Sequence, residues 1–443
     1  MQTERSVKGR ERRGLSEGRL AALLIMPAML LIACIAVYPV LRTVWYSLFD
    51  LRLNHPTRNE TNLSYSLDLE KYADGMYTIH TQLSKAIEKA ETEEERASAR
   101  ELLELIGQGE HTLFATRERQ EQLAQVDAMV SAYQPVNDRA LRFLSVSGAE
   151  VADYKQLLQK ASGLAKNAVQ KAAGSVKQLE KASQALDTLS FAVVEPNFAG
   201  LGNYVRYLGD ERLWTSVFNT TVFTLFAVSF ELLLGMLVAL LMNQNFRGRG
   251  VVRASVLIPW SIPASTSAII WKFMYDGQYG IVAKAFAALG IVPSAAFILT
   301  TRAGSMFGMI VSDVWKTTPF MALLLLAGLQ TIDQSLYEAA KVDGSGKFRS
   351  FFSITLPLLK PTMLVSILFR TLDTFKAFDL FSVMTYGAND TESISLFSYK
   401  VMFAQMDFGS GSTISIILFF FVLLICLFYI KGLGTDLFSS RKA

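Results

Sequence analysis

Charged side chains lie inside two strongly apolar stretches of this 443-residue chain. The stretch 303–328 contains Asp313 and Lys316, whose spacing of three places them on one face of a helix. The stretch 362–386 contains four more charges at steps of three: Arg370, Asp373, Lys376 and Asp379. A charge held in lipid costs about 2.5–3.5 kcal/mol. These side chains must therefore face the protein interior or a water-filled cavity.

Two roles for these charges are open. They are either structural ion pairs that hold helices together or the lining of a polar pathway for a hydrophilic solute. Four charges of alternating sign on one helix exceed what helix association requires, which favours the pathway. Nearby aromatic rings suit a sugar, whose C–H faces pack on rings while its hydroxyls meet polar partners, although such rings more often serve packing alone. These rings are Trp315, Phe320, Phe375 and Phe378. The role of Glu231, alone in the stretch 217–242, is ambiguous, and a purely structural pairing across the bundle is open to it.

The composition excludes several classes of protein. Hydrophobic residues make up 51% and charged residues 19%, against about 25% charged residues in soluble proteins. No charge occurs from Leu20 to Leu41, so neither a soluble enzyme nor a disordered chain fits. The net charge of +4, without a basic stripe interleaved with aromatics, gives no support for nucleic-acid binding. Cys34 and Cys426 both lie in apolar runs, which argues against a disulfide framework or a thiolate metal site.

Known catalytic motifs are missing from the sequence. His55, His80 and His111 lack the spacing of metal ligands. The run Gly344–Lys347 resembles the end of a phosphate loop, but Phe348 stands where that motif requires Ser or Thr, and Lys341 where it requires glycine. There is no H-E-x-x-H and no G-x-S-x-G. We therefore predict no catalytic residue, no metal site and no ATPase site in this chain.

The stretches that must position the charges are membrane-spanning helices. Six segments approach the roughly 20 apolar residues that a span needs: 20–41, 217–242, 254–275, 303–328, 362–386 and 411–430. We thus expect an all-α integral membrane protein. The first segment is too long for a signal peptide, and the run Tyr38–Arg42 offers no small-residue cleavage site, so it is an uncleaved span.

Basic residues set the predicted orientation. They gather in stretches that share one side if all six spans are real: Arg5, Lys8, Arg10, Arg12, Arg13 and Arg19; Arg247, Arg249 and Arg253; Lys341, Lys347, Arg349 and Lys360; and Lys431, Arg441 and Lys442. By the positive-inside rule, both termini are cytoplasmic.

A long hydrophilic insertion at 51–197 then lies outside the cytoplasm. The tracts 57–134 and 136–195 contain no proline and are rich in helix formers, with breaks expected at Gly107, Gly109 and Pro135. Apolar residues in the second tract recur at the spacing of a coiled-coil seam: Leu158, Ala161, Ala165, Ala168, Ala172, Val176, Leu179, Ala182, Leu186 and Leu189. We expect a projecting helical bundle or hairpin. It is either a spacer or a docking platform, and a rigid rod slightly favours docking.

A small, exposed helical element is expected in the cytoplasmic loop between the fourth and fifth spans. Ala339 and Ala340 allow close approach by another protein, and Gly344 allows a bend in the backbone. Pro357 and Pro361 punctuate the return of the chain to the membrane. An element of this kind suits docking in a groove on a partner.

This loop resembles the EAA loop of binding-protein-dependent ABC importer permeases, in the branch of the maltose and glycerol-3-phosphate permeases. The resemblance covers 1–50 and 198–443 but not the insertion. The residues that carry it are Glu338, Ala339, Ala340, Asp343, Gly344, Leu356, Pro357 and Pro361, with Phe198–Tyr204, Trp214, Asn219-Thr220 and Phe375–Asp379. Ser345 replaces a usual alanine, and Tyr386–Asp390 replaces a glycine-rich, proline-ended segment.

The resemblance implies three parts: a cytoplasmic tail and first span (1–50), the insertion (51–197) and a permease core (198–443). It implies that the loop residues Glu338, Ala339, Ala340, Asp343, Gly344, Leu356 and Pro357 couple to an ATPase. It places solute contacts on Lys316, Thr317, Phe320, Arg370, Asp373, Thr374 and Ala377.

The partners that the resemblance implies are a second permease in a heterodimer, an ABC ATPase dimer that binds ATP and Mg, and an extracytoplasmic solute-binding protein. The location is a bacterial inner (cytoplasmic) membrane, and the solute is a sugar or a related polyol.

Two other classes remain as alternatives. A membrane sensor or receptor also carries a helical bundle between spans, but it needs a cytoplasmic signalling module, and the loop near 329–361 is too short for one. A secondary transporter commonly shows internal repeats, and we find no convincing repeat between the two halves. A permease subunit of a sugar ABC importer is the leading hypothesis.

Overall fold

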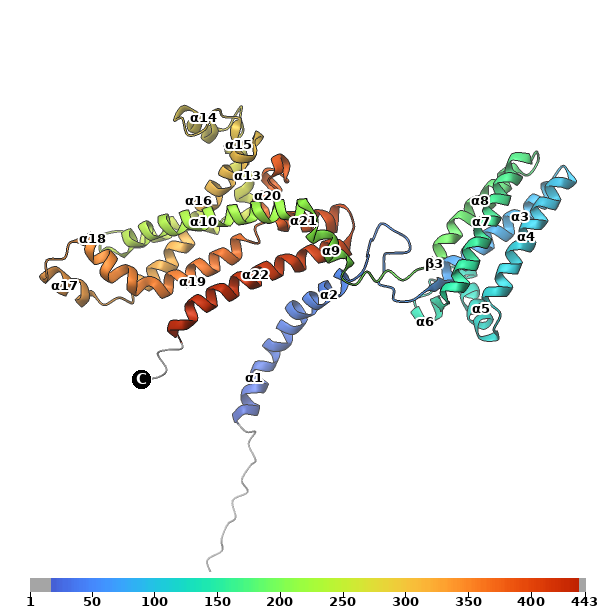
Figure 1. The fold of residues 1–443 in the computed structure, drawn as a ribbon, viewed down its shortest axis with the longest axis horizontal. Coiled ribbons are helices and arrows are strands. Elements are labelled where there is room, and N and C mark those ends of the chain that lie inside the picture. Colours follow the sequence, from blue (N-terminus) through green and yellow to red (C-terminus); the bar gives the residue numbers. More distant parts are fainter. Residues whose placement is uncertain (1–16, 438–443) are drawn as a thin grey trace, which may run out of the picture.

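The computed structural model describes residues 17–437, so the basic residues Arg5, Lys8, Arg10, Arg12, Arg13, Arg441 and Lys442 lie outside the described residues. Long apolar helices form a core, and a separate helical bundle is joined to one end of it (Figure 1). The first helix combines α1 (Glu17–Ile32), a π-helical turn (Ala33–Val37) and α2 (Tyr38–Ser47). It contacts α22 (Phe408–Leu437) through α2, while α1 diverges from the core in Figure 1.

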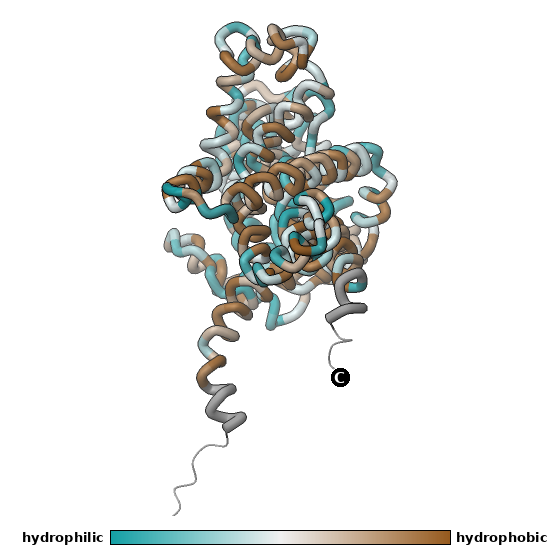
Figure 2. Tube along the Cα trace, turned by 90° about the vertical axis from the view of Figure 1, so that its left-hand side faces the viewer, coloured by the Kyte–Doolittle hydropathy of each residue, from teal (hydrophilic) through white to brown (hydrophobic). Residues whose placement is uncertain are grey.

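Five helices are long and apolar enough to cross a membrane: Leu24–Ser47, Glu211–Asn243, Arg302–Leu329, Lys347–Met384 and Phe408–Lys431. The central ones are α10 (Glu211–Asn243), α16 (Arg302–Leu329) and α19 (Leu356–Thr374). Figure 2 shows stretches of hydrophobic residues throughout the core and in the first helix. Exposed side chains such as Leu24 and Ile35 agree with a surface that faces lipid or another membrane protein. A mostly helical membrane protein is therefore confirmed, but the strict all-α prediction was wrong, because a small three-stranded sheet lies in the insertion.

The segment 254–275 is not the straight span that we expected. The helices α11 (Arg249–Val256) and α12 (Ile258–Ser261) are separated from α13 (Ala264–Met274) by a bend of 88°. Pro263 lacks an N–H and holds Ile262 in an extended conformation, with ψ 131°. The described residues therefore contain five spans, or six if this bent pair is one span.

The segment 362–386 belongs to the fourth of these candidate spans, but its helix is interrupted, so the charges at steps of three share one continuous helix only in its first half. The helix α19 ends at Thr374, and α20 begins at Asp379 (Asp379–Met384). The N–H groups of Lys376 and Ala377 bond to carbonyls three residues earlier, which tightens the end of the helix. The face that carries Arg370 and Asp373 consequently stops before Lys376.

Shorter elements connect and surround the spanning helices of the core. Their bounds are α9 (Gly202–Leu208), α14 (Ile281–Ala288), α15 (Phe297–Thr300), α17 (Gln334–Val342), α18 (Lys347–Ser350), a π-helical turn Phe351–Thr355, a 3-10 turn Ala388–Asp390, α21 (Ile394–Tyr399) and a π-helical turn Lys400–Ala404.

The insertion is a bundle on a small antiparallel sheet. Its helices are α3 (Leu69–Lys89), α4 (Glu93–Leu113), α5 (Arg117–Ser131), α6 (Arg139–Arg142), α7 (Gly148–Lys171) and α8 (Val176–Leu189), followed by a 3-10 turn Ser190–Ala192. The strands β1 (Ser66–Asp68), β2 (Phe143–Ser145) and β3 (Val193–Val194) pair in the order β2-β1-β3. Polar N-caps begin several helices, including a capping box formed by Ser147 and Glu150.

The coiled-coil seam folds back on itself instead of forming one rod. The helices α7 and α8 are separated by the turn 172–175 and pack against each other, so the two halves of the seam meet in one core. Glu95 accepts hydrogen bonds from the backbone N–H of Ala173 at 2.7 Å and from Ser175 Oγ at 2.9 Å. The Ala173 N–H lowers the pKa of the Glu95 carboxyl. These contacts hold the turn against the start of α4.

The predicted breaks at Gly107 and Gly109 were wrong, because both residues lie inside α4. The break at Pro135 is confirmed, since it falls between α5 and α6. Gly174, in the turn between α7 and α8, is the glycine that the fold of this hairpin requires. A Cβ there would lie 2.5 Å from the carbonyl oxygen of Lys89, so only glycine fits this close approach.

Both ends of the insertion meet at one residue, which we call the Asn197 junction. The Asp50 N–H donates to the Asn197 carbonyl at 2.8 Å, and Asn197 Nδ2 donates to the carbonyls of Asp50 and Glu60, each at 2.9 Å. The Asn62 N–H donates to Asn197 Oδ1 at 2.8 Å. The bundle therefore leaves the core and returns to it at a single point (Figure 1).

We expect Gly174→Ala to destabilise the α7–α8 hairpin by about 1–3 kcal/mol, because its Cβ overpacks against backbone. Gly163→Ala is the matched control: it lies inside α7, and its Cβ would meet nothing within 4 Å. That change should stabilise the hairpin by about 0.5–1 kcal/mol through helix propensity. Amide hydrogen exchange of α7 and α8 in the full chain measures both. Equal protection in the two variants would contradict the assigned turn.

Candidate functional site

A buried ion-pair cluster lies where α10, α16 and α19 meet. We call it the Arg370 cluster; its members are Arg370, Glu231, Asp313, Thr317 and Asp373. Arg370 Nε and Nη2 donate to the two oxygens of Glu231 at 2.6 and 2.8 Å. Nη2 also reaches Asp313 Oδ2 at 3.1 Å. The side chain of Arg370 is 3% exposed and that of Glu231 is 0% exposed, so this pair is removed from solvent.

Small residues allow these helices to approach closely. Gly235 lies one turn after Glu231, and a Cβ there would be 2.8 Å from the side chain of Met321 and 3.3 Å from the Ala322 nitrogen. Gly328 has the same role between α16 and α19, where a Cβ would meet Thr362 at 2.6 Å. Such small residues are typical of packed membrane helices. They place the carboxylate of α10 within hydrogen-bond distance of the guanidinium of α19.

The structure brings three of the seven predicted solute residues together. Thr317 is buried and donates to Glu231 Oε1 at 2.6 Å, Arg370 is the centre of the cluster, and Asp373 bonds to Arg370 Nη1. Asp373 differs from the other members because its side chain is 72% exposed. It is therefore the carboxylate through which the cluster reaches the surrounding space.

The other four predicted residues lie outside the cluster. Lys316, Phe320 and Ala377 are partly exposed, and Thr374 is buried, with no hydrogen-bond partner for its Oγ1 among the described residues. Phe320 stacks on Trp260, with ring centroids 5.4 Å apart and an interplanar angle of 14°. These rings provide an aromatic surface on the exposed part of α16.

Sequence reasoning left Glu231 open, with pairing across the bundle as one interpretation but no partner named, and the structure makes it the principal partner of Arg370. The available signal was its isolation, because a single acid in an apolar span needs a cationic partner. The cluster contains three carboxylates and one guanidinium. Chemically, carboxylates that exceed their cationic partners are suited to accept hydrogen bonds from hydroxyl groups.

The predicted coupling residues lie at the far end of the core. Glu338, Ala339 and Ala340 belong to α17, while Asp343 and Gly344 follow it, and Gly344 has φ +78°. The Ser345 N–H donates to the Ala340 carbonyl at 2.8 Å, which closes the helix end. Leu356 and Pro357 form the first turn of α19.

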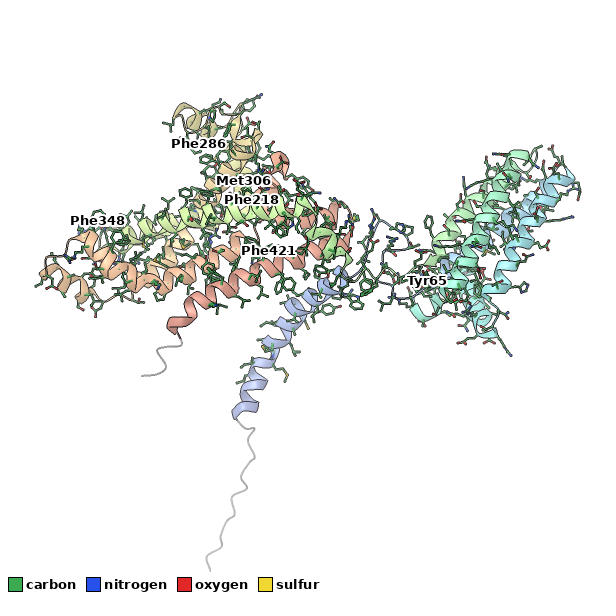
Figure 3. All side chains as sticks on the ribbon, viewed as in Figure 1. Tyr65, Phe218, Phe286, Met306, Phe348 and Phe421 are labelled. Atoms are coloured by element: carbon green, nitrogen blue, oxygen red, sulfur yellow. The ribbon has the colours of Figure 1, made fainter. Side chains whose placement is uncertain are left out.

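The end of the core at α17 and α18 presents an exposed surface. Glu338 and Ala339 are exposed, as are Val342 and Phe348, at 87% and 85% respectively. Tyr337 Oη lies 2.8 Å from Thr355 Oγ1, which ties α17 to the start of α19. Figure 3 shows Phe348 at this end and Tyr65 at the base of the insertion, beyond the other end of the core.

Comparison with known proteins places this core among transport permeases. A family described as "Binding-protein-dependent transport system inner membrane component" matches residues 231–433. The chain is 46% identical over 209 residues to the trehalose/maltose transport system permease protein MalF of Thermococcus litoralis, covering 47% of this chain and 70% of that protein. It is 41% identical over 202 residues to the sulfoquinovosyl glycerol transport system permease protein SmoG of Agrobacterium fabrum, covering 46% and 65%.

Solved structures of transporters also match part of the chain. A bacterial ABC transporter involved in the import of alginate matches with a TM-score of 0.49 and 22% identity, covering 54% of this chain and 84% of that chain.

The exposure of the predicted solute residues yields a test by thiol labelling, after Cys34 and Cys426 have been replaced. We expect cysteines at Lys316 and Asp373 to react readily with small polar thiol reagents, because both positions are accessible. A cysteine at Thr317 is the buried control and should react far more slowly. Labelling rates of the assembled protein in membranes measure this. Equal protection of all three positions would favour a purely structural ion-pair cluster.

Proposed function

The chain belongs to the family of inner membrane components of binding-protein-dependent transport systems, and from this premise we propose that its solute is a sugar or a related polyol or glycoside. The chain is the permease subunit of an ABC importer, a multi-pass inner membrane protein without catalytic activity of its own. ATP is bound by the partner ATPase.

The proposed solute site is the exposed side of the Arg370 cluster. Asp373 offers a carboxylate to hydroxyl donors, and the stacked Phe320 and Trp260 offer an apolar ring surface. A sugar needs both, because its hydroxyls require hydrogen-bond partners and its C–H faces pack on rings. Lys316, Thr317, Arg370, Thr374 and Ala377 complete the proposed site. The substrates named for the two relatives are both carbohydrates, which supports this class of solute.

The proposed coupling element is α17 with Gly344. The observation that carries this proposal is that α17 is exposed, ends in a left-handed glycine and is tied to α19 through Tyr337 and Thr355. A partner that binds α17 and shifts it would also move α19, together with Arg370 and Asp373. We assign the partner as the ATPase dimer, with Glu338, Ala339, Ala340, Asp343, Leu356 and Pro357 at the contact.

The proposed orientation follows from the two ends of the core. The basic loop at α17 and α18 faces the cytoplasm, as the positive-inside rule requires, and both termini lie on that side. The insertion at 51–197 lies at the opposite end and is thus extracytoplasmic (Figure 1). This assignment counts the bent pair α11–α13 as the third of six spans.

The remaining proposed partners occupy surfaces that this chain leaves open. The exposed apolar first helix suits a second permease in a heterodimer. The insertion is a packed bundle rather than an extended tether, and we propose that it docks the solute-binding protein. Its alternative role is a spacer.

Replacing Gly344 with leucine should abolish most uptake while the protein still reaches the membrane. A side chain at φ +78° costs about 1–2 kcal/mol, and it would distort the end of α17 where the ATPase docks. Solute uptake per amount of membrane-inserted permease measures this. Gly346→Ala is the matched control, because φ is not positive there and its Cβ would meet nothing within 4 Å. Normal uptake by Gly344→Leu would contradict the coupling assignment.

Deleting residues 64–195 and joining the ends by a short glycine linker should leave a core that folds. The Asn197 junction survives this deletion, since Asp50, Glu60 and Asn62 remain. If the insertion docks the binding protein, basal ATP hydrolysis by the assembled transporter persists, but stimulation by the binding protein falls. Unchanged stimulation would favour the spacer, and failure to assemble would make the insertion part of the core.

A further inference from the structure

Glu231 is a fully buried carboxylate near the middle of α10, and both of its oxygens are occupied. Oε2 accepts from Arg370 Nε at 2.6 Å, and Oε1 accepts from Arg370 Nη2 at 2.8 Å and from Thr317 Oγ1 at 2.6 Å. Its side chain is 0% exposed. A carboxylate enclosed in this way does not contact a solute. Any effect of Glu231 on solute binding must therefore act through Arg370.

The contacts with Glu231 fix how Arg370 is oriented. A carboxylate that holds two N–H groups of a guanidinium also fixes the plane of that group. With Nε and Nη2 on Glu231, and Nη2 shared with Asp313, the group left over is Nη1. Nη1 bonds to Asp373, the member of the cluster that is 72% exposed. A chain of contacts thus leads from buried Glu231 to an accessible carboxylate.

We propose that Glu231 is a positioning residue of the solute site. By accepting hydrogen bonds from Arg370 Nε and Nη2, it sets the direction of Nη1. It thereby holds the Asp373 carboxylate where that carboxylate meets the solute. This inference rests on the proposed function, in which Asp373 faces the sugar. It adds to that function a residue on a third helix, α10, that determines how strongly the site binds.

Replacing Glu231 with glutamine separates this role from simple packing. The two side chains have nearly the same shape, but glutamine carries no charge and has one acceptor oxygen in place of two. The Arg370 guanidinium then relies on Asp313 and Asp373 for its counter-charge. The plane of the guanidinium is then no longer fixed by two bonds to one charged carboxylate, so Nη1, and with it Asp373, is no longer held in one direction.

The experiment uses the complete transporter in proteoliposomes, with Cys34 and Cys426 replaced and a reporter cysteine at Ala377, which is partly exposed. The probes are trehalose and maltose, and the readout is the sugar concentration that halves the labelling rate of the reporter. We expect Glu231→Gln to raise that concentration by about tenfold, as for the loss of a charge-assisted hydrogen bond. Glu211→Gln, an exposed acid at the start of the same helix, should leave it unchanged.

The outcomes separate this inference from the proposed function. If neither sugar protects the reporter in the parent, the proposed sugar site itself is overturned. If the parent is protected and Glu231→Gln assembles with the same half-protection concentration, only the positioning role is overturned. A purely structural role would lower the amount of assembled transporter without moving that concentration.

Glu231→Asp keeps the test decisive if the glutamine variant does not assemble. Aspartate retains the charge but withdraws the carboxylate by one methylene, which shifts Arg370 without leaving it unpaired. We expect an increase of about threefold in the half-protection concentration, smaller than for glutamine because the charge-assisted bond persists. A value equal to that of the parent would overturn the proposal.

Discussion

The cost of placing charge inside a membrane governs the arrangement of this core. Arg370 is tolerable in an apolar helix only because Glu231 and Asp313, from two other helices, neutralise it at hydrogen-bond distance. That requirement fixes the rotation of α10, α16 and α19 about their axes, since each must turn its polar residue towards the others. The glycines at 235 and 328 then follow, because the helices must approach closely for the pairs to form.

Much of the core could be predicted because its signals are local. Apolar runs of sufficient length identified the spans, and the helix–glycine–proline pattern at 337–361 identified the exposed helical element at the end of the core. The pairing of Arg370 with Glu231 could not be predicted, because 139 residues separate the partners and only packing brings them together. The end of α19 at Thr374 was hidden for a similar reason. The linker that follows α19 is held by a distant residue, since Ser393 Oγ donates to the Ala377 carbonyl.

In the insertion, the expected bundle or hairpin is present, but the apolar pattern did not show where the chain turns back. The seam residues between Leu158 and Leu189 recur at a steady spacing, and nearly all of these seam residues are buried. The spacing continues across the turn because both arms of the hairpin line the same core, so periodicity alone does not separate a rod from a hairpin. The deciding contacts are those of Gly174 and Glu95 with other parts of the bundle, and they arise only after folding.

The Asn197 junction has a consequence for how such chains diversify. The side-chain amide of Asn197 holds the two ends of the insertion together. The geometry of the core therefore does not depend on the chain between those ends. Any module whose own termini are adjacent can be spliced at this place without disturbing the spans. Recombination at 62 and 197 would thus exchange whole modules among transporters and leave the spanning helices intact, and a single asparagine shared by otherwise divergent chains would record such events.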